Sequence, residues 1–260
     1  MSLLRIAAAV AATAIASGAQ ASIVIGAGGQ VYTQNFDTLA TTGSSVTWAN
    51  DSTLAGWSLF RQPAPGTAIT SYAVNDGSSN TGSFYSYGTG TSSDRALGGL
   101  GSGGSYFGSP GNPAVAGWIA ASFTNTAASA LNGFAVQFDG EQWRNGGNAT
   151  AQSMVLEYGF GSSFGSVATW SAAGSAFNWT SVVNTTTAAA VNGNSAGRVA
   201  NVGGSITTPW ASGATLWLRW IENNDSGNDH GLAIDNFKLT AGSEVAAVPV
   251  PPSEIGRAHV

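Results

Sequence analysis

TLWLRWIENNDSGNDHGLAIDNFKLT, residues 215–240, is the stretch that indicates the architecture of this protein. Leu216, Leu218 and Trp220 fall on one face of its first part, with the period of two that a half-buried β-strand shows. Residues 232–239 alternate in the same way after a polar loop. The stretch therefore predicts two half-buried strands, joined by the densest group of polar and charged side chains in the chain.

The composition extends this prediction to the rest of the chain. The 260 residues include 36 glycines, and Asn-Gly, Asp-Gly and Ser-Gly pairs interrupt the sequence at short intervals, which favours many strands and turns over helices. A chain of this length can bury one substantial core. We therefore expect an all-β fold over residues 22–241, a single antiparallel two-sheet β-sandwich of the jelly-roll or concanavalin-like type.

Short apolar segments bounded by Gly, Pro, Asn or Asp give the expected strands. They are residues 30–36, 46–48, 57–61, 69–74, 84–87, 95–97, 118–123, 131–138, 153–160, 176–183, 198–202, 216–222 and 232–239. Residues 97–113, LGGLGSGGSYFGSPGNP, are expected to form a long loop. Phe134, Val136 and Phe138 share one face of their strand and are assigned to the core.

Charge excludes one class of partner. Only 8% of residues are charged, against about a quarter in ordinary soluble domains. The net charge is −5, and the clustered Lys and Arg that phosphate binding needs are missing from the sequence. Nucleic acid is therefore not expected as a partner. The sequence has no Cys, so neither disulfides nor a Cys nucleophile are expected.

The first residues have the pattern of an export signal. Arg5 is followed by an Ala-rich apolar run and by Ala19-Gln20-Ala21, the small-x-small pattern of a cleavage site. The apolar run is short for a spanning helix, which needs about 20 residues. Residues 1–21 are therefore expected to be a signal peptide, and the protein is expected to be exported.

The other end becomes Pro-rich. Residues 242–253, GSEVAAVPVPPS, form a linker whose Val248-Pro249-Val250-Pro251 resembles the start of the sorting signal of exported bacterial proteins of the PEP-CTERM type. The alternative is an ordinary Pro-rich tail. Residues 254–260, EIGRAHV, look like a translated sequencing adapter and are interpreted as an artefact. The resemblance implies a truncated C-terminus, with membrane attachment only through an anchor missing from the sequence.

The polar loop after the first strand offers oxygen ligands. Asn223, Asp225 and Asp229 place short oxygen-bearing side chains around Gly227, which suits a hard cation such as calcium. The alternative is a polar turn that uses Asn, Asp and Gly for their backbone tolerance. No cofactor other than calcium is indicated.

Asp235 lies inside an apolar segment, where an unpaired carboxylate would be costly. Arg219 in the preceding strand is the expected partner, if the loop returns the chain beside it. We therefore expect a largely buried structural ion pair between Arg219 and Asp235.

The segment DGEQWR, residues 139–144, joins two carboxyls, an aromatic ring and an arginine. Asp139 and Glu141 are two residues apart and share a strand face, so they are candidates for the two carboxyls that a glycosidase needs. Glu141 with Glu157 is the other candidate pair. A salt bridge between Glu141 and Arg144 explains the segment equally well.

Aromatic side chains suggest a second reading of the same segment. A flat ring flanked by hydrogen-bonding side chains suits a sugar, whose C–H face packs on the ring. Trp143 fits this description, with Glu141, Gln142 and Arg144 beside it. Trp57 and Tyr106 are further candidates of this kind, and packing under loops is the alternative for each ring.

GEQWR, WLRW and DHGLAIDNF together resemble segments of uncharacterised exported bacterial β-sandwich proteins. The resemblance implies a surface-displayed sandwich and transfers no catalytic residue. We therefore expect an exported, non-catalytic protein of the cell surface or extracellular matrix that binds an extracellular polysaccharide or matrix component. The alternative is a jelly-roll polysaccharide hydrolase or lyase.

Overall fold

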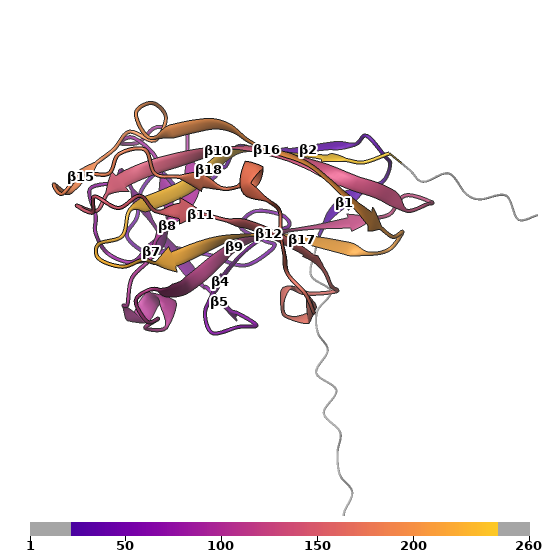
Figure 1. Cartoon of the computed structure of the whole chain (residues 1–260), viewed down its shortest axis with the longest axis horizontal. Coiled ribbons are helices and arrows are strands. Elements are labelled where there is room, and N and C mark those ends of the chain that lie inside the picture. Colours follow the sequence, from indigo (N-terminus) through magenta and orange to yellow (C-terminus); the bar gives the residue numbers. More distant parts are fainter. Residues whose placement is uncertain (1–21, 244–260) are drawn as a thin grey trace, which may run out of the picture.

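A computed structural model describes residues 22–243 as two packed β-sheets (Figure 1). The expected signal peptide, most of the Pro-rich linker and the adapter-like tail lie outside these residues. In the view of Figure 1, β10, β16, β18 and β2 form the upper layer, and β9, β17, β12, β4 and β5 lie below it. The predicted all-β sandwich is confirmed.

One sheet has seven strands, ordered β13-β12-β17-β9-β4-β5 with β1 beside β9. Its members are β1 (Ile23–Ile25), β4 (Trp57–Arg61), β5 (Thr67–Ala68), β9 (Ala114–Asn125), β12 (Leu156–Phe160), β13 (Ser171–Ala172) and β17 (Thr215–Asn224).

The other sheet has nine strands, ordered β15-β10-β18-β8-β7-β6-β3, with β16 also beside β10 and β2 beside β18. Its members are β2 (Val31–Gln34), β3 (Val46–Thr47), β6 (Ser71–Asn75), β7 (Ser83–Tyr87), β8 (Ala96–Leu100), β10 (Leu131–Asn145), β15 (Ala189–Ala190), β16 (Arg198–Trp210) and β18 (Gly231–Ala241). Pairing is antiparallel except between β1 and β9 and between β6 and β7.

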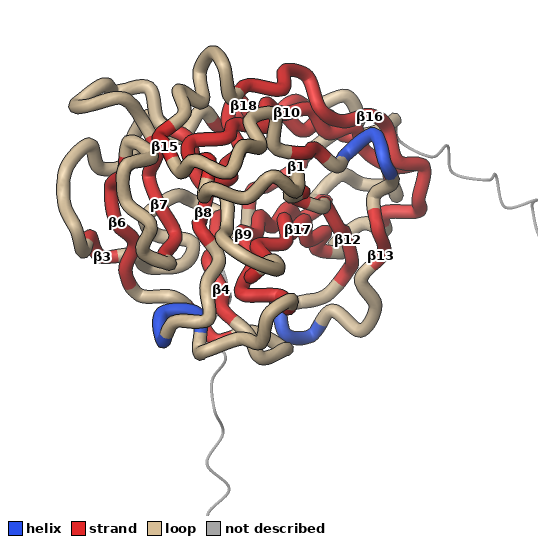
Figure 2. The backbone as a smooth tube through the Cα atoms, turned by 60° about the vertical axis from the view of Figure 1, so that its left-hand side comes forward, coloured by secondary structure: helices blue, strands red, loops and turns tan. Residues whose placement is uncertain are grey.

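The remaining elements are short. β11 (Ser153–Met154) and β14 (Trp179–Thr180) form a two-stranded ribbon. The helices of residues 22–243 are single 3₁₀ turns, η1 (Ser105–Phe107), η2 (Phe164–Ser166) and η3 (Ser175–Phe177), drawn in blue in Figure 2 among long tan connections. None of them is long and apolar enough to span a membrane.

The core lies between the sheets. Leu216, Leu218 and Trp220 of β17 face it and are fully buried, and the indole of Trp57 stacks on that of Trp220 with ring centroids 5.7 Å apart. From the opposite sheet the core receives the side chains of Phe134, Val136, Phe138, Leu232, Ile234, Phe237 and Leu239. The assignment of Phe134, Val136 and Phe138 to the core is confirmed.

The expected relation between the last two strands is wrong. β17 pairs with β9 and β12 in the seven-stranded sheet, whereas β18 pairs with β10, β8 and β2 in the nine-stranded sheet. The loop between them crosses from one sheet to the other. Alternation alone could not distinguish this crossing from a hairpin, because both bury one face of each strand.

A β-bulge in β18 changes which side chains face the core. Between the pairs Gln137↔Lys238 and Asp139↔Asp235, β18 holds one residue more than β10. Asn236 in this bulge has a φ of 49°, the left-handed conformation that Asn tolerates better than most residues. Ile234 and Phe237 therefore both reach the core, and Asp235 lies on the outer face.

Several strand boundaries also differ from expectation. β10 continues through the segment 139–144 to Asn145, so these residues lie within the sheet and not after it. Part of the expected loop 97–113 is β8, and most of the expected strand 176–183 is irregular. The start of β8 was expected within residues 95–97, but its glycine-rich end was assigned to the loop; there Gly98 and Gly99 leave room for Ala233 and for the side chain of Glu222.

Candidate functional site

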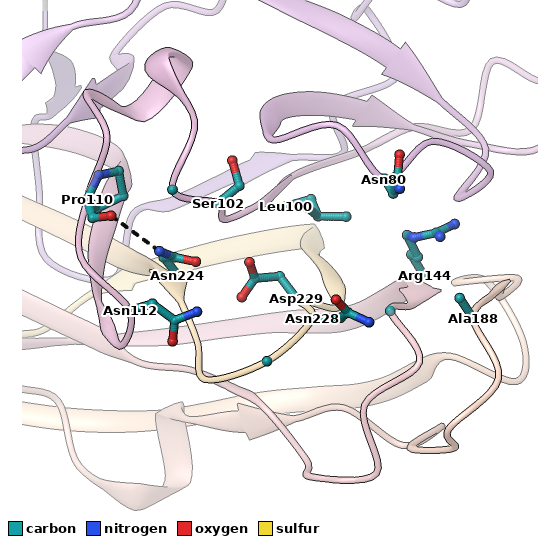
Figure 3. A pocket seen from close by; sticks show the side chains of 13 residues that line it. Asn80, Leu100, Ser102, Pro110, Asn112, Arg144, Ala188, Asn224, Asn228 and Asp229 are labelled. Atoms are coloured by element: carbon teal, nitrogen blue, oxygen red, sulfur yellow. Dashed lines mark hydrogen bonds between the residues drawn. The ribbon is translucent and has the colours of Figure 1, made fainter.

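Loops from both sheets meet in a polar cleft at one end of the sandwich, shown in Figure 3. It has a volume of about 470 Å³. The loops that follow β6, β8, β10 and β17 contribute to it, as does the loop before β9. Its lining consists of Asn80, Leu100, Ser102, Gly103, Pro110, Asn112, Arg144, Gly146, Ala188, Asn224, Gly227, Asn228 and Asp229. We call this the end cleft.

One wall of the end cleft is fixed by Asn224, the last residue of β17. Its Nδ2 donates hydrogen bonds to the carbonyls of Gly111, at 2.6 Å, and Pro110, at 3.4 Å. In Figure 3 its side chain faces the segment of Pro110 and Asn112, and the bond to Pro110 is dashed. The two bonds tie the loop before β9 to the end of β17, so this wall is held in place without a helix or a disulfide.

Arg144, from the end of β10, lies on the other side of the end cleft, near Asn80 and Ala188 in Figure 3. Its Nη1 donates to the carbonyls of Gly77 and Ser78 at 2.9 and 3.0 Å. These two hydrogen bonds hold the half-buried guanidinium in place on the cleft wall. Arg144 therefore lines the end cleft, and the alternative considered for it, a salt bridge to Glu141, is not formed.

Asp229 places a carboxyl in the end cleft between Asn224 and Asn228 (Figure 3). Its Oδ1 accepts a hydrogen bond from the backbone N–H of Asp225 at 2.7 Å. Burial raises the pKa of Asp229 to about 7, outweighing this hydrogen bond. The carboxyl can therefore change its charge near neutral pH.

Glu222 is a buried carboxyl on β17 that the sequence reading did not single out. It is 4% exposed, and its Oε2 has no hydrogen-bond partner within residues 22–243. Burial, reinforced by Asp229 and Asp225, raises its pKa well above the ordinary value. The sequence pattern did not single out Glu222, because it is the last residue of the expected strand 216–222, a position where a solvent-facing carboxylate is common.

The structure brings the residues predicted as calcium ligands only partly together. Asn223 lies in β17, and Asp225 and Asp229 are joined by the backbone hydrogen bond described above. Within residues 22–243 no group of three or more His, Cys, Asp or Glu side chains is placed to hold a metal ion. Calcium takes six to eight oxygen ligands, so the two carboxyls of this turn would supply only a minority of them.

Trp143 is not an exposed sugar platform. Its side chain is 1% exposed, stacks on Tyr87 with ring centroids 5.9 Å apart, and donates from Nε1 to Glu141 Oε2 at 2.9 Å. The neighbouring Gln142 is fully buried, and its Oε1 accepts from the N–H groups of Val182 and Val183. The predicted ring-stacking role of Trp143 and the ligand contact of Gln142 are therefore wrong, because Tyr87 and Gly193 cover Trp143 and the segment of Val182 and Val183 covers Gln142.

The other aromatic candidates are also engaged internally. Trp57 is fully buried in the core, so its proposed ligand contact is wrong. Tyr106 is half-buried; it packs edge-on against Phe107 and donates its hydroxyl to the carbonyl of Ser71 at 2.7 Å. Trp57 packs between the sheets and not beneath a loop, whereas Tyr106 supports the alternative, packing among loop residues.

The proposed catalytic carboxyls are only partly brought together. Asp139 and Glu141 lie on the outer face of β10, while Glu157 lies on β12 in the other sheet. Asp139 accepts from Arg198 Nη2 at 2.7 Å, Asn236 Nδ2 at 3.0 Å and the N–H of Asn201 at 2.9 Å. Glu157 therefore cannot pair with Glu141, and Asp139 is occupied by its own partners.

A second, smaller pocket lies on the outer face of the nine-stranded sheet and has a volume of about 160 Å³. Its lining consists of Asp94, Glu141, Asn194, Arg198, Asp235 and Asn236. We call it the acidic pocket. Burial raises the pKa of Glu141 to about 7 and that of Asp235 to about 8, and each carboxyl's neighbours of like charge add to the shift.

The expected pair of Arg219 and Asp235 is not formed. Arg219 Nε donates to Glu157 Oε2 at 2.7 Å on the outer face of the seven-stranded sheet, and its guanidinium lies 4.0 Å from the ring centroid of Trp170. Asp235 belongs to the other sheet. The sequence pattern paired the two residues wrongly because it assumed a hairpin, whereas Arg219 pairs with Glu157.

Comparisons with known proteins add little. No protein-family model matches the chain, and no curated protein matches it. Among solved structures the chain is similar to an arabinose-bound MgGH51 α-L-arabinofuranosidase, with a TM-score of 0.32 and 11% sequence identity. The match covers 86% of this chain and 30% of that enzyme's chain. Similarity at this level carries no argument about activity.

Proposed function

We propose that this chain is an exported, non-catalytic protein of the cell surface or extracellular matrix that binds carbohydrate in the end cleft. The observation that carries the proposal is the convergence of Arg144 and Asp229, from distant parts of the chain, on one cleft that also holds several Asn side chains. In Figure 3, Asp229 lies in the middle of the lining and Arg144 lies to its right.

The chemistry of the lining suits a sugar. Asn offers both a donor and an acceptor, Arg only donors and an ionised Asp only acceptors, so together they can bond hydroxyls in several orientations. The volume of about 470 Å³ lies within the range of small-molecule sites. The sequence predicted that a sugar would stack on an aromatic ring. We propose instead that the cleft recognises the sugar through hydrogen bonds.

Binding is tested with a glycan array, followed by calorimetric titration of the best glycan against wild type, Asn112→Ala and Asn228→Ala. Both residues line the end cleft. We expect each variant to weaken binding about five- to thirtyfold, the loss of one or two hydrogen bonds. Asn132→Ala is the matched control, since Asn132 is an exposed residue at the opposite end of β10. Unchanged binding in both cleft variants would place the site elsewhere.

The non-catalytic part is tested with a reducing-sugar assay on the same glycan. We expect no turnover by wild type. Turnover that is lost in Glu141→Gln would instead support the hydrolase or lyase alternative, because Glu141 is a buried carboxyl with a raised pKa in the acidic pocket.

A further inference from the structure

The acidic pocket shares no lining residue with the end cleft, so it needs its own explanation. Its floor is formed by Glu141 and Asp235, which are 1% and 3% exposed. Its rim is formed by the exposed side chains of Asp94 and Arg198 and by the half-buried Asn194. The pocket is thus a small opening above two buried carboxyls.

Asp235 is incompletely partnered. Its Oδ1 is buried and has no hydrogen-bond partner within residues 22–243. Leaving a buried acceptor unsatisfied costs about 1 to 3 kcal/mol, and more for a charged group, so such an atom points to a donor supplied from outside the chain or to a proton of its own.

The charges around the pocket are unbalanced. Arg198 is already paired with Asp139 at 2.7 Å, and Asp94 is held by Asn194 through a hydrogen bond of 2.7 Å. No cation within residues 22–243 contacts the carboxyls of Glu141 or Asp235 in a salt bridge. A ligand that enters this pocket therefore meets carboxyl groups whose negative charge, when they are ionised, is not balanced by Arg198. A cationic ligand would balance it.

We propose that the acidic pocket binds a primary ammonium group, with the buried carboxyls of Asp235 and Glu141 as acceptors. An ammonium has three N–H donors and no acceptor, which matches the unpartnered Oδ1 of Asp235 and the acceptors beside it. A metal ion fits less well, because no group of three or more His, Cys, Asp or Glu side chains among residues 22–243 is placed to hold one. A volume of about 160 Å³ admits a small head group such as an amino-sugar ring or the end of an alkylamine.

Binding is coupled to proton release. The raised pKa values of Glu141, about 7, and Asp235, about 8, mean that the pocket holds protons near neutral pH. The charged groups that face these carboxyls are Asp94, Asp139 and Arg198, and Asp37 in the loop after β2 also acts on Asp235. An ammonium favours the ionised carboxyls, so it displaces a proton when it binds.

The probe is n-butylamine, titrated calorimetrically into the full chain, with n-butanol as the neutral control of the same shape. The amine keeps its charge through the range, since an alkylammonium has a pKa near 10. For exchange of one proton we expect affinity to rise about tenfold from pH 6 to pH 7 and to level off near pH 8. Titrations in phosphate and in HEPES, whose ionisation enthalpies differ and which contain no primary amine, are expected to show net proton release on binding.

The variants are Asp235→Asn and Glu141→Gln, which keep the side-chain shape and remove the charge. We expect each to weaken n-butylamine at least tenfold at pH 8 and to reduce proton release. Asn112→Ala in the end cleft is expected to leave the amine unaffected, so failure of the amine site and failure of the proposed glycan site are separable. Circular dichroism melts show whether each variant is folded; Asn194→Ala, at the rim, is the second variant if a floor substitution unfolds.

Two sources of ammonium are then compared at pH 7. D-glucosamine binding more tightly than n-butylamine, with N-acetyl-D-glucosamine not binding, would identify an amino sugar as the ligand class. The opposite order would identify an alkylammonium such as a lysine side chain. Equal binding of n-butylamine and n-butanol, undiminished binding in Asp235→Asn, or no net proton release would overturn the proposal.

Discussion

Arg219 Nε donates to Glu157 Oε2 at 2.7 Å, across a register in which the two residues are direct Cα partners on β17 and β12. Their side chains are 14% and 20% exposed, and Arg219 lies against the rings of Trp170 and Trp118. The pair anchors the aromatic cluster that covers the outer face of the seven-stranded sheet.

A double-mutant cycle tests this pair. Arg219→Met, Glu157→Gln and the double variant are compared by urea denaturation. Because the pair is mostly buried, we expect a coupling energy of about 1 to 3 kcal/mol. This lies above the coupling energies of exposed ion pairs and below the cost of breaking a fully buried one. The matched cycle of Arg219→Met with Asp235→Asn is expected to be additive within about 0.5 kcal/mol, since these residues lie in different sheets. Coupling only in the second cycle would contradict the structure.

Gly193 tests the burial of Trp143. A Cβ at Gly193 would overlap the indole of Trp143, so Gly193→Ala must displace a ring that is stacked on Tyr87. We expect a loss of about 1 to 3 kcal/mol in the free energy of unfolding, as for other overpacked sites. Gly111→Ala is the control, because the nearest atom to its Cβ would be 3.9 Å away. Equal stability of the two variants would show that the ring is free to move.

The buried carboxyls predict how stability depends on pH. Glu141 and Asp235 have folded-state pKa values of about 7 and about 8, above the ordinary 4.5 and 3.8. Between about pH 4 and pH 8 the folded chain therefore holds protons that the unfolded chain has lost, and the free energy of unfolding falls as pH rises.

Urea denaturation at half-unit steps of pH measures this fall, which is at most about 1.4 kcal/mol per pH unit for each proton. Glu141→Gln is expected to make it shallower without abolishing it, since Glu222 and Asp229 shift in the same direction. The exposed Asp76→Asn serves as control, with a pKa lowered by its hydrogen bonds to Ser78. A wild-type stability that rises from pH 5 to pH 8 would contradict the burial of these groups.

Asp229 predicts the pH dependence of glycan binding in the end cleft. Its pKa of about 7 lies above the ordinary 3.8, so the carboxylate that accepts hydroxyl hydrogen bonds becomes dominant only above neutral pH. We expect the affinity for the best array glycan to increase two- to tenfold from about pH 6 to pH 8, and Asp229→Asn to remove this increase. Asn112→Ala should weaken binding while keeping the pH dependence. A pH-independent affinity in wild type would exclude Asp229 from the contact.

Calcium removal gives a further prediction. Only Asp225 and Asp229 of the proposed ligand set carry carboxyls, and they share a turn. We expect the melting temperatures with EDTA and with about 1 mM CaCl₂ to agree within about 2 °C, because a ligand stabilises only in proportion to its binding. A larger rise with calcium that is lost in Asp229→Asn would restore the calcium interpretation.

The sequence alone determined the class of fold and several of its parts. The period of two in residues 215–240 and the frequent Gly turns were sufficient for a two-sheet sandwich, since these features depend only on local geometry. The same polarity rules located Arg144 and Asp229, two residues of the end cleft, because charged groups are rare in this chain. Phe134, Val136 and Phe138 were likewise assigned to the core correctly.

Only the tertiary structure decided which side chains meet. Alternation sorts residues into two faces but does not say which sheet a strand joins, so Arg219 was paired with Asp235 instead of Glu157. It also does not reveal the bulge at Asn236, which moves Asp235 to the outer face, or the loops that bury Trp143. The acidic pocket joins β10, β16 and β18 with the loop of Asp94, and such contacts depend on long-range pairing that no local pattern encodes.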